Sequence, residues 1–227
     1  MPEAKRPARP RAMRDRRRRL VRRVERLGLE LPADLLDSLE AYLDLLTLWN
    51  AKMNLTGADL DAAPDEALDR LIAEPLAAVQ HVRAEQRVLW DIGSGGGSPA
   101  IPMKLATPRL ALRLFERKNR KAAFLREAAR RLTLEPVDVE TTRVEELLAQ
   151  PDMHDAADLV TIRGVRVDPQ TLSVLQAFVR PGGEVWLFRG ERLDGTDVLA
   201  APPLRITAVH PLVDTLKSRL VVLSKST

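Results

Sequence analysis

Apolar positions follow one spacing in the first third of this chain and another in the rest. Between residues 34 and 50 they recur every three or four residues, which predicts an amphipathic helix. The pattern breaks at residues 54–57. A second helical stretch then runs from about residue 64 to 82, interrupted or offset at Pro75. This part of the chain therefore predicts a pair of helical segments.

From residue 87 onward, short apolar runs alternate with helical patterns. Strands alternating with helices predict a mostly parallel sheet with right-handed crossovers. Only about nine residues separate the last two runs, too few for a helical crossover, so these strands should pair antiparallel. The expected strands are 88–92, 110–115, 137–141, 158–162, 184–188, 204–209 and 219–224, and the expected helices are 101–106, 119–132, 144–149 and 169–179.

Charge marks off a further segment at the start of the chain. Residues 1–23 carry 11 Lys/Arg and two acidic residues, a net charge of +9, whereas the whole chain has a net charge of +4. A polycationic segment suits a polyanion such as nucleic acid, and the alternative is a merely solvated tail. We therefore expect a basic flexible arm at 1–30, a helical cap at 31–83 and an α/β sheet domain at 84–227.

Composition excludes several classes of site. The chain has no cysteine, which rules out disulfides, thiolate metal sites and a cysteine nucleophile. Its three histidines lie far apart without metal-binding spacing, so we expect no metal. No apolar run reaches the ~20 residues of a membrane span, so we expect no membrane partner. The early arginines are not followed by the apolar stretch of an export signal, and we expect a cytoplasmic protein.

A glycine-rich loop, Asp91-x-Gly93-x-Gly95-x-Gly97, joins the first expected strand to a helix. Glycines allow a tight turn and a close ligand, and the helix start adds positive potential. Glu116 ends the next strand, where a carboxylate can accept hydrogen bonds from ribose hydroxyls. Asp91 can offset a positive charge at the methionyl end of S-adenosylmethionine. The pattern therefore favours this cofactor.

Two other interpretations of the glycine loop stay open. A dinucleotide fold prefers G-x-G-x-x-G, but Ser98 stands at the sixth position, so that match is partial. A structural turn between strand and helix is the other. A phosphate-binding P-loop is excluded, because the terminal Gly-Lys-Ser/Thr is missing. The expected C-terminal antiparallel pair favours a methyltransferase sheet over an all-parallel dinucleotide sheet.

Four segments match motifs of one known family. They are Trp49 to Thr56 (W-N-x-x-x-N-L-T), Asp91 to Pro102 (D-V-G-S-G-x-G-x-P-G-I-P), Glu116 with Lys121 to Leu125 (E-S-x-x-K-K-x-x-F-L), and Arg143 to Glu146 with Thr161 to Gly164 (R-x-E-E and S-R-A). Through them the chain, over roughly residues 34 to 225, resembles the small-subunit ribosomal RNA guanine-N7 methyltransferases, the methyltransferase G or GidB-like family.

The resemblance implies a fold and a reaction. The fold is a Rossmann-like class I methyltransferase, with a mostly parallel seven-stranded sheet, a C-terminal antiparallel hairpin and an N-terminal helical cap. The reaction is methyl transfer from S-adenosyl-L-methionine to N7 of a guanine in 16S ribosomal RNA. The implied partner is 16S rRNA or the 30S subunit, and we expect a monomer.

The resemblance also implies residue roles. The cofactor would contact the loop backbone around its methionyl part, a carboxylate at its ribose and the start of a helix at its adenine. RNA would enter beside the cofactor mouth. The implied cofactor residues are Asp91, Gly93, Gly95, Ser98, Glu116, Val144, Glu145 and Arg163, with Arg163 also positioned at the methyl transfer site, and the implied substrate residues are Asn50, Lys52 and Asn54.

The chemistry of guanine N7 fits this set of residues. Its in-plane lone pair is unprotonated at neutral pH, so the site needs alignment rather than a general base. Arg163 can stack on or hydrogen-bond a splayed guanine, or it can pair with a nearby acid. A run of basic residues at 117–131 can form a phosphate-binding track or a solvated helix face.

Three places depart from the family pattern. The segment from Leu71 to Pro75 replaces H-x-x-D-S, Ile162 and Gly164 flank Arg163 in place of Ser and Ala, and Ser98 stands where an apolar residue is usual. These changes leave the fold unaffected but keep two alternatives open. One is a small-molecule methyltransferase with an incidental arm, and the other is an inactive RNA-binding paralogue.

Overall fold

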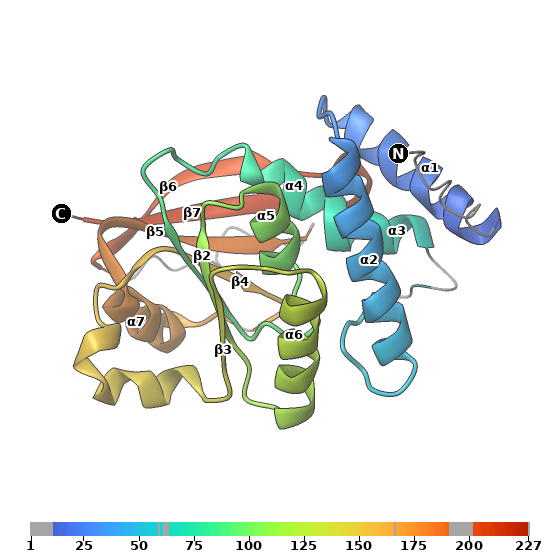
Figure 1. Ribbon diagram of the computed structural model, residues 1–227. Helices are drawn as coiled ribbons and strands as arrows, with labels where there is room; N and C mark the ends of the chain where they lie inside the picture. Colours follow the sequence, from blue (N-terminus) through green and yellow to red (C-terminus); the bar gives the residue numbers. More distant parts are fainter. Residues whose placement is uncertain (1–10, 59, 61–63, 166, 191–201, 227) are drawn as a thin grey trace, which may run out of the picture.

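A seven-stranded sheet forms the centre of the computed structural model, which describes residues 11–58, 60, 64–165, 167–190 and 202–226 (Figure 1). The strand order is β3-β2-β1-β4-β5-β7-β6. The strands are β1 (Val88–Ile92), β2 (Ala111–Phe115), β3 (Val137–Glu140), β4 (Ala157–Arg163), β5 (Val179–Arg189), β6 (Leu204–Pro211) and β7 (Arg219–Lys225).

Strands β1 to β5 are parallel, and β7 pairs antiparallel with both β5 and β6. The predicted mostly parallel sheet with an antiparallel C-terminal pair is confirmed. The chain runs outward from β1 through β2 to β3, then returns to place β4 on the other side of β1. In open α/β sheets, ligands bind in the crevice outside the carboxyl ends of strands at such a reversal.

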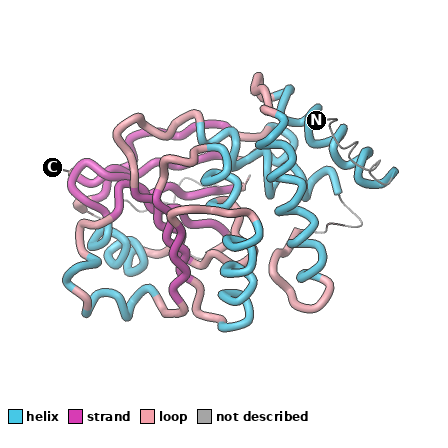
Figure 2. Tube along the Cα trace, in the orientation of Figure 1, coloured by secondary structure: helices cyan, strands magenta, loops and turns pink. Residues whose placement is uncertain are grey.

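Helices cover both faces of the sheet (Figures 1 and 2). One apolar cluster joins the N-terminal helices and the helices at 100–106 and 119–131 to one face, and a second joins the helix at 169–178 and the segment after β3 to the other. The helices are α2 (Ala33–Asn50), α3 (Pro64–Leu68), the π-helix η1 (Asp69–Ala73), α4 (Glu74–Val79), α5 (Ala100–Ala106), α6 (Asn119–Arg131), α7 (Pro169–Phe178) and the short 3-10 helices η2 (Val144–Ala149), η3 (Pro151–Met153) and η4 (Asp214–Leu216).

The second helical stretch continues through Pro75 instead of breaking there. The π-helix η1 follows α3, and Pro75 lies in the first turn of α4. A proline near a helix start sacrifices no obligatory hydrogen bond, and a π-turn changes the bonding register locally. The predicted offset at this proline therefore takes the form of a π-turn.

The prediction of a flexible arm was wrong for residues 11–26, which form helix α1 (Arg11–Arg26). Leu20 and Val24 lie one turn apart on this helix and are fully buried in the N-terminal apolar cluster. Arginines beside them pair with acidic residues of α2 and η1. Residues 1–10 of the predicted arm lie outside the described residues, and the boundary between cap and sheet domain near residue 83 stays a prediction.

Two further elements differ in detail from the sequence expectation. Residues 144–149 form a 3-10 helix, where the sequence predicted a helix without specifying its type. Strand β5 begins at Val179, five residues before the expected start, and includes the Pro-Gly-Gly sequence at 181–183, with Gly182 at φ +76°. Across the described helices we find none with the length and apolar character that a bilayer crossing requires.

Candidate active site

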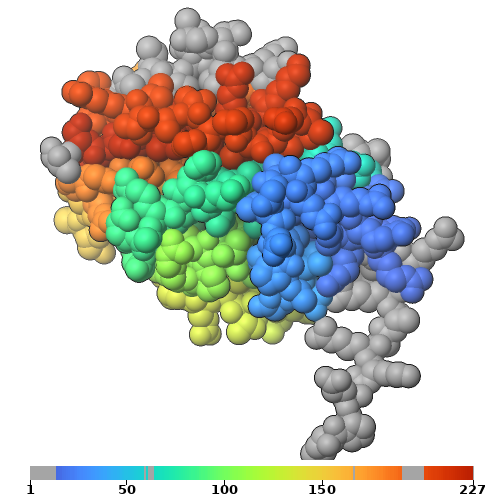
Figure 3. Space-filling view, turned by 90° about the horizontal axis from the view of Figure 1, so that it is seen from above, coloured from blue at the N-terminus to red at the C-terminus, as the bar shows by residue number. Residues whose placement is uncertain are grey.

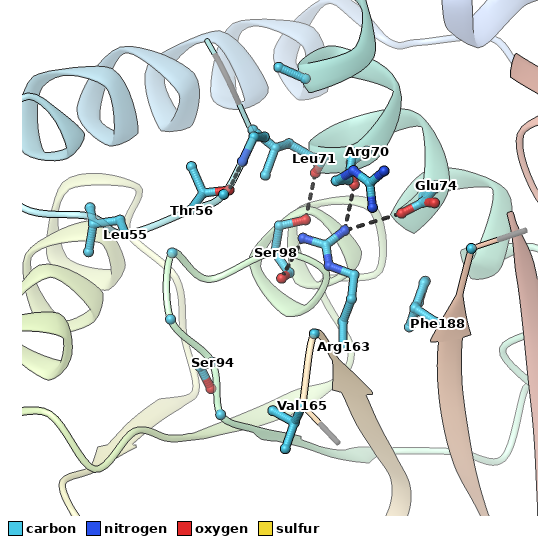
Figure 4. Close-up of a pocket in the computed structure, with 18 of the residues that line it drawn as sticks. Leu55, Thr56, Arg70, Leu71, Glu74, Ser94, Ser98, Arg163, Val165 and Phe188 are labelled. Carbon is cyan, nitrogen blue, oxygen red and sulfur yellow. Dashed lines mark hydrogen bonds and ion pairs between the residues drawn. The ribbon is translucent and has the colours of Figure 1, made fainter. Parts of the chain in front are cut away.

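A cavity of about 1060 Å³ opens at the carboxyl ends of β1, β4 and β5, where the sheet reverses its winding direction (Figure 4). The glycine loop after β1 forms one wall. The loop at 55–58 and the α3–η1 segment form another, and the ends of β4 and β5 complete it. Among the residues implied by the family resemblance, Gly93, Gly95, Ser98 and Arg163 line this cavity.

The glycine loop is held to β2 by its own backbone. The amides of Gly93 and Ser94 both donate to the carbonyl of Phe115, at 2.9 and 3.1 Å. Gly97 has φ +86°, and a Cβ there would lie 2.4 Å from Cδ1 of Ile101. The loop therefore needs glycine at this position, both for its left-handed backbone and for its close packing on α5.

Glu116 lies directly beside the glycine loop. Its side chain is 6% exposed, Oε2 accepts from the amide of Gly95 at 3.0 Å and Oε1 accepts from the amide of Lys118 at 2.8 Å. Two backbone donors thus fix the carboxylate in one orientation. Each carboxylate oxygen can accept a second hydrogen bond, so the group can still receive ribose hydroxyls.

Asp91 lies beneath the loop rather than on the cavity wall. It is 1% exposed, and Oγ1 of Thr161 on β4 donates to its carboxylate at 2.6 Å. Burial raises the pKa of Asp91 to about 6, against the lowering effect of this hydrogen bond. At neutral pH the group is therefore mostly a buried anion without an ion-pair partner among the described residues.

Arg163 ends β4 and spans the cavity wall to two other segments (Figure 4). Its Nη2 donates to the carbonyl of Ser98 at 2.7 Å, and its Nη1 donates to the carbonyl of Arg70 and lies 3.3 Å from Oε2 of Glu74. Burial lowers the pKa of Arg163, opposed by Glu74, and burial likewise raises the pKa of Glu74. The alternative of an acid partner for Arg163 is therefore realised, while the side chain still borders the cavity.

Two of the departures from the family pattern touch each other. Oγ of Ser98 donates to the carbonyl of Leu71 at 2.7 Å, which joins the glycine loop to η1. The third departure, Gly164, lines the cavity with φ +67°. Of the departing residues, Leu71, Glu74, Ser98 and Gly164 line the cavity, whereas Ile162 is buried in β4 and does not.

Sequence reasoning missed two residues of this site. Glu74 was noted only as part of a divergent segment, although it is the one acid there and a partner for Arg163. Tyr42 was assigned only to the apolar stripe of α2. It is fully buried, and its hydroxyl donates to the carbonyl of Gly96 at 2.6 Å. It is the only tyrosine of the chain, and its polar hydroxyl on an otherwise apolar stripe was a signal that could have been used.

The three implied substrate residues have different positions. Oδ1 of Asn50 accepts from the amides of Leu55 and Thr56, at 2.9 and 3.2 Å, and so shapes the loop that lines the cavity. Lys52 and Asn54 are exposed, and neither is part of the cavity lining. Asn50 therefore supports the wall, and contact with RNA stays a prediction for all three.

The implied adenine contacts lie outside the main cavity. Val144 and Glu145 begin η2, just after β3, with Val144 half-buried and Glu145 exposed. A smaller cavity of about 400 Å³ adjoins this segment and is lined by Arg117, Lys118, Thr141, Thr142, Arg143 and Glu146. The adenine role of Val144 and Glu145 remains a prediction.

Several basic side chains of α6 already have partners within the protein. Arg130 and Arg131 pair with Glu127, and Arg126 donates to Thr141 and to the carbonyl of Val139. Lys121, in the first turn of the helix, lines the main cavity. The phosphate-binding track on this helix stays a prediction. Within the described residues no cluster of His, Cys, Asp and Glu is arranged to hold a metal ion.

Comparison with known proteins identifies relatives. The family model described as rRNA small subunit methyltransferase G matches residues 35–200. Proteins named ribosomal RNA small subunit methyltransferase G are similar to this chain in Syntrophotalea carbinolica (31% identity, covering 80% of this chain and 81% of the relative) and in Sorangium cellulosum (36% identity, covering 76% and 71%).

Solved structures are similar in fold. A crystal structure of a point mutant of MtNAS in complex with S-adenosylmethionine aligns with a TM-score of 0.55 at 13% identity, covering 83% of this chain and 76% of that one. A methyltransferase from Aquifex aeolicus described as S-adenosylmethionine-dependent aligns with a TM-score of 0.53 at 13% identity, covering 74% and 94%. The observed sheet is therefore that of class I methyltransferases.

Proposed function

The chain belongs to the rRNA small subunit methyltransferase G family, and from this premise we propose that it methylates N7 of a guanine in 16S ribosomal RNA. Its methyl donor is S-adenosylmethionine, and its substrate is ribosomal RNA of the small subunit. The observation that carries the proposal is the cavity at the sheet reversal, bordered by the glycine loop and by Arg163. The family match over residues 35–200 includes every residue that lines this cavity except Leu216.

The residues present fit the methyl donor. A cavity of about 1060 Å³ has room for a nucleoside and an amino acid tail together with a base. Glycines keep side chains out of the loop wall, and a fixed carboxylate stands next to it. Bound S-adenosylmethionine supplies a methyl group activated by its sulfonium charge.

We assign the donor-binding roles as follows. The backbone at Gly93, Gly95 and Ser98 holds the methionyl part, and Glu116 accepts hydrogen bonds from the ribose. Asp91 acts from beneath the loop, where its buried negative charge favours a cationic ligand above it. Val144 and Glu145 at the start of η2 contact the adenine edge.

Arg163 acts as a positioning group rather than as a base. Its guanidinium is fixed by two carbonyls and a carboxylate, so it presents a defined plane at the cavity wall. A splayed guanine can stack on this plane or accept a hydrogen bond from it. Because N7 carries its own lone pair, alignment is the contribution that the reaction needs. Asn50 holds the loop at 55–56 over the same cavity, beside which RNA enters past Lys52 and Asn54.

The protein is proposed to act as a monomer on 30S subunits or on naked 16S RNA in the cytoplasm, where ribosomes are assembled. An enzyme for small molecules would not need RNA, and an inactive paralogue would not transfer label. The open cavity favours activity over the inactive alternative.

Tritium transfer from labelled S-adenosylmethionine into 30S subunits and into naked 16S RNA tests the proposal. We expect label in one guanine, mapped by cleavage at the N7-methylated position. Glu116→Gln should reduce methyl transfer at least tenfold at limiting donor. Glu135→Gln, an exposed change just before the amino end of β3, should leave it unchanged. Label in small molecules but not in RNA, or no label at all, would overturn the assignment.

A further inference from the structure

We propose that helix α1 is a fixed docking surface for the ribosomal RNA backbone, with Arg14, Arg18, Arg22 and Arg26 as its phosphate contacts. The inference rests on the proposed function, because it assumes that an RNA is held at the cavity. The sequence predicted a flexible basic arm, whereas here the basic residues of the described N-terminal segment lie on a helix fixed to the protein.

The inner side of α1 is attached to the body of the protein. Leu20 and Val24 are fully buried in the apolar cluster that also contains α2. Ion pairs flank these two residues, and they use arginines that would otherwise repel one another. The pairs are Arg16 with Asp44, Arg17 with Asp37 (2.6 Å) and Glu40, and Arg23 with Asp69 (2.9 Å) and Asp65 (2.9 Å).

The outer side of α1 carries the remaining arginines. Arg14, Arg18, Arg22 and Arg26 recur every four residues, which places them along one side of the helix over about 18 Å. All four are exposed. Arg18 pairs with Asp15 on the same helix, while Arg14, Arg22 and Arg26 have no partner in the part of the chain that the structure describes.

Two acidic residues, Asp15 and Glu25, also lie toward this side. The outer surface therefore keeps an excess of positive charge after both acids are counted. Within the described residues, five acids of α2, α3 and η1 already pair with other arginines of α1, namely Asp37, Glu40, Asp44, Asp65 and Asp69. A polyanion such as an RNA backbone is complementary to this surface.

Helix α1 is next to the cavity wall. Arg19 and Arg23 pair with Asp65 of α3, and Arg23 also pairs with Asp69 of η1. The residues that directly follow these two acids, Glu66 and Arg70, line the cavity. Figure 3 shows the N-terminal helices in blue gathered at one side of the molecule. An RNA strand whose guanine enters the cavity can therefore reach the arginines of α1 with its flanking phosphates.

The chemistry of α1 favours RNA over a lipid surface. A helix that lies on a membrane inserts apolar side chains beside its basic ones. On α1 the apolar Leu20 and Val24 face the protein, and Val21 packs against the same cluster. Arginine forks match phosphate oxygens, and a row of them at fixed spacing suits a repeating phosphate backbone.

The test compares two triple variants of the full chain. One is Arg14→Gln/Arg22→Gln/Arg26→Gln. The matched control is Arg87→Gln/Arg109→Gln/Arg205→Gln, which removes the same charge from exposed positions near the amino ends of β1, β2 and β6, away from the cavity at the carboxyl ends. Affinity for 16S RNA is measured by fluorescence anisotropy at salt concentrations from roughly 50 to 250 mM KCl, alongside methyl transfer and donor affinity by calorimetry.

We expect the α1 variant to bind RNA roughly tenfold or more weakly at low salt and the slope of log affinity on log salt to become shallower by about 2 to 3. Its donor affinity and Tm should match those of the wild type. Equal slopes for the α1 variant and the control would overturn the inference, and so would a wild-type protein without RNA affinity. RNA binding that depends on α1 without methyl transfer would keep the inference and overturn the proposed function alone. If the α1 variant had a shallower salt slope than the wild type for binding anionic vesicles but not for binding RNA, α1 would be a membrane contact, and this result would also overturn the inference.

Discussion

Replacing Asp91 with asparagine should change how the stability of this protein depends on pH. The carboxylate is 1% exposed, and burial raises its pKa from 3.8 to about 6. Because the folded-state pKa is raised, the stability that Asp91 contributes is fully present below pH 3.8 and is lost as pH rises toward 6. The difference between the two pKa values corresponds to about 3 kcal/mol once both states are ionised.

Part of this change falls in an accessible pH range. Between about pH 4.5 and 7.5 the wild type should lose about 2 kcal/mol of unfolding free energy through this group. Asp91→Asn keeps the shape of the side chain and an oxygen that can accept from Oγ1 of Thr161. Its remaining effect is therefore a pH-independent change of about 1 kcal/mol in the free energy of unfolding. The loss over the same pH range should therefore be about 2 kcal/mol smaller in the variant.

Urea denaturation at several pH values measures this difference. Asp152→Asn, an exposed aspartate, serves as the control and should follow the wild-type pH dependence. Calorimetry with S-adenosylmethionine near neutral pH completes the assay, since removal of the buried charge should weaken binding at least severalfold. Parallel pH curves for wild type and Asp91→Asn would refute the claim that a buried, ionised Asp91 destabilises the fold.

Gly97→Ala should lower the free energy of unfolding by about 2 to 5 kcal/mol, because its φ is +86° and the new Cβ would meet Ile101. A lowered Tm would show this loss, whereas Gly57→Ala, with open space around the new Cβ, should leave the Tm nearly unchanged. Tyr42→Phe should cost about 1 kcal/mol in urea denaturation through its lost hydrogen bond to the glycine loop, and an unchanged free energy would contradict that role. Arg163→Lys should lower kcat at least tenfold in methyl transfer, because an ammonium cannot reproduce the fixed guanidinium plane; a wild-type kcat would contradict the positioning role.

The sheet could be predicted from the sequence because its strands are short apolar runs separated by helices. All seven expected strands occur, and the nine-residue gap before β7 correctly excluded a parallel crossover. The glycine loop was equally readable, since Gly97 requires a backbone that few other residues adopt. Features of this kind depend on residues that are close in the sequence, so their spacing is enough to predict them.

Contacts between distant segments could not be predicted in the same way. Arg163 pairs with Glu74, which lies 89 positions away in the chain, and no local spacing predicts that pair. The N-terminal arginines suggested a free arm by their number alone. Their partners on α2, α3 and η1 lie 20 to 46 residues away, and the burial of Leu20 and Val24 holds α1 beside these elements.

One wall of the cavity is built from main-chain carbonyls, and this affects how freely its sequence can vary. The carbonyls of Arg70, Leu71, Gly96 and Ser98 all accept hydrogen bonds from side chains that cross between segments. A carbonyl is supplied by every amino acid, so the bonds at Arg70 and Leu71 do not depend on the side chains of these two residues, whereas Ser98 also donates through its own Oγ and Gly96 leaves little room for a Cβ. Substitutions at positions 70 and 71 can therefore leave this part of the cavity wall unchanged in shape, provided that the π-helix η1 keeps their two carbonyls directed at Arg163 and Ser98.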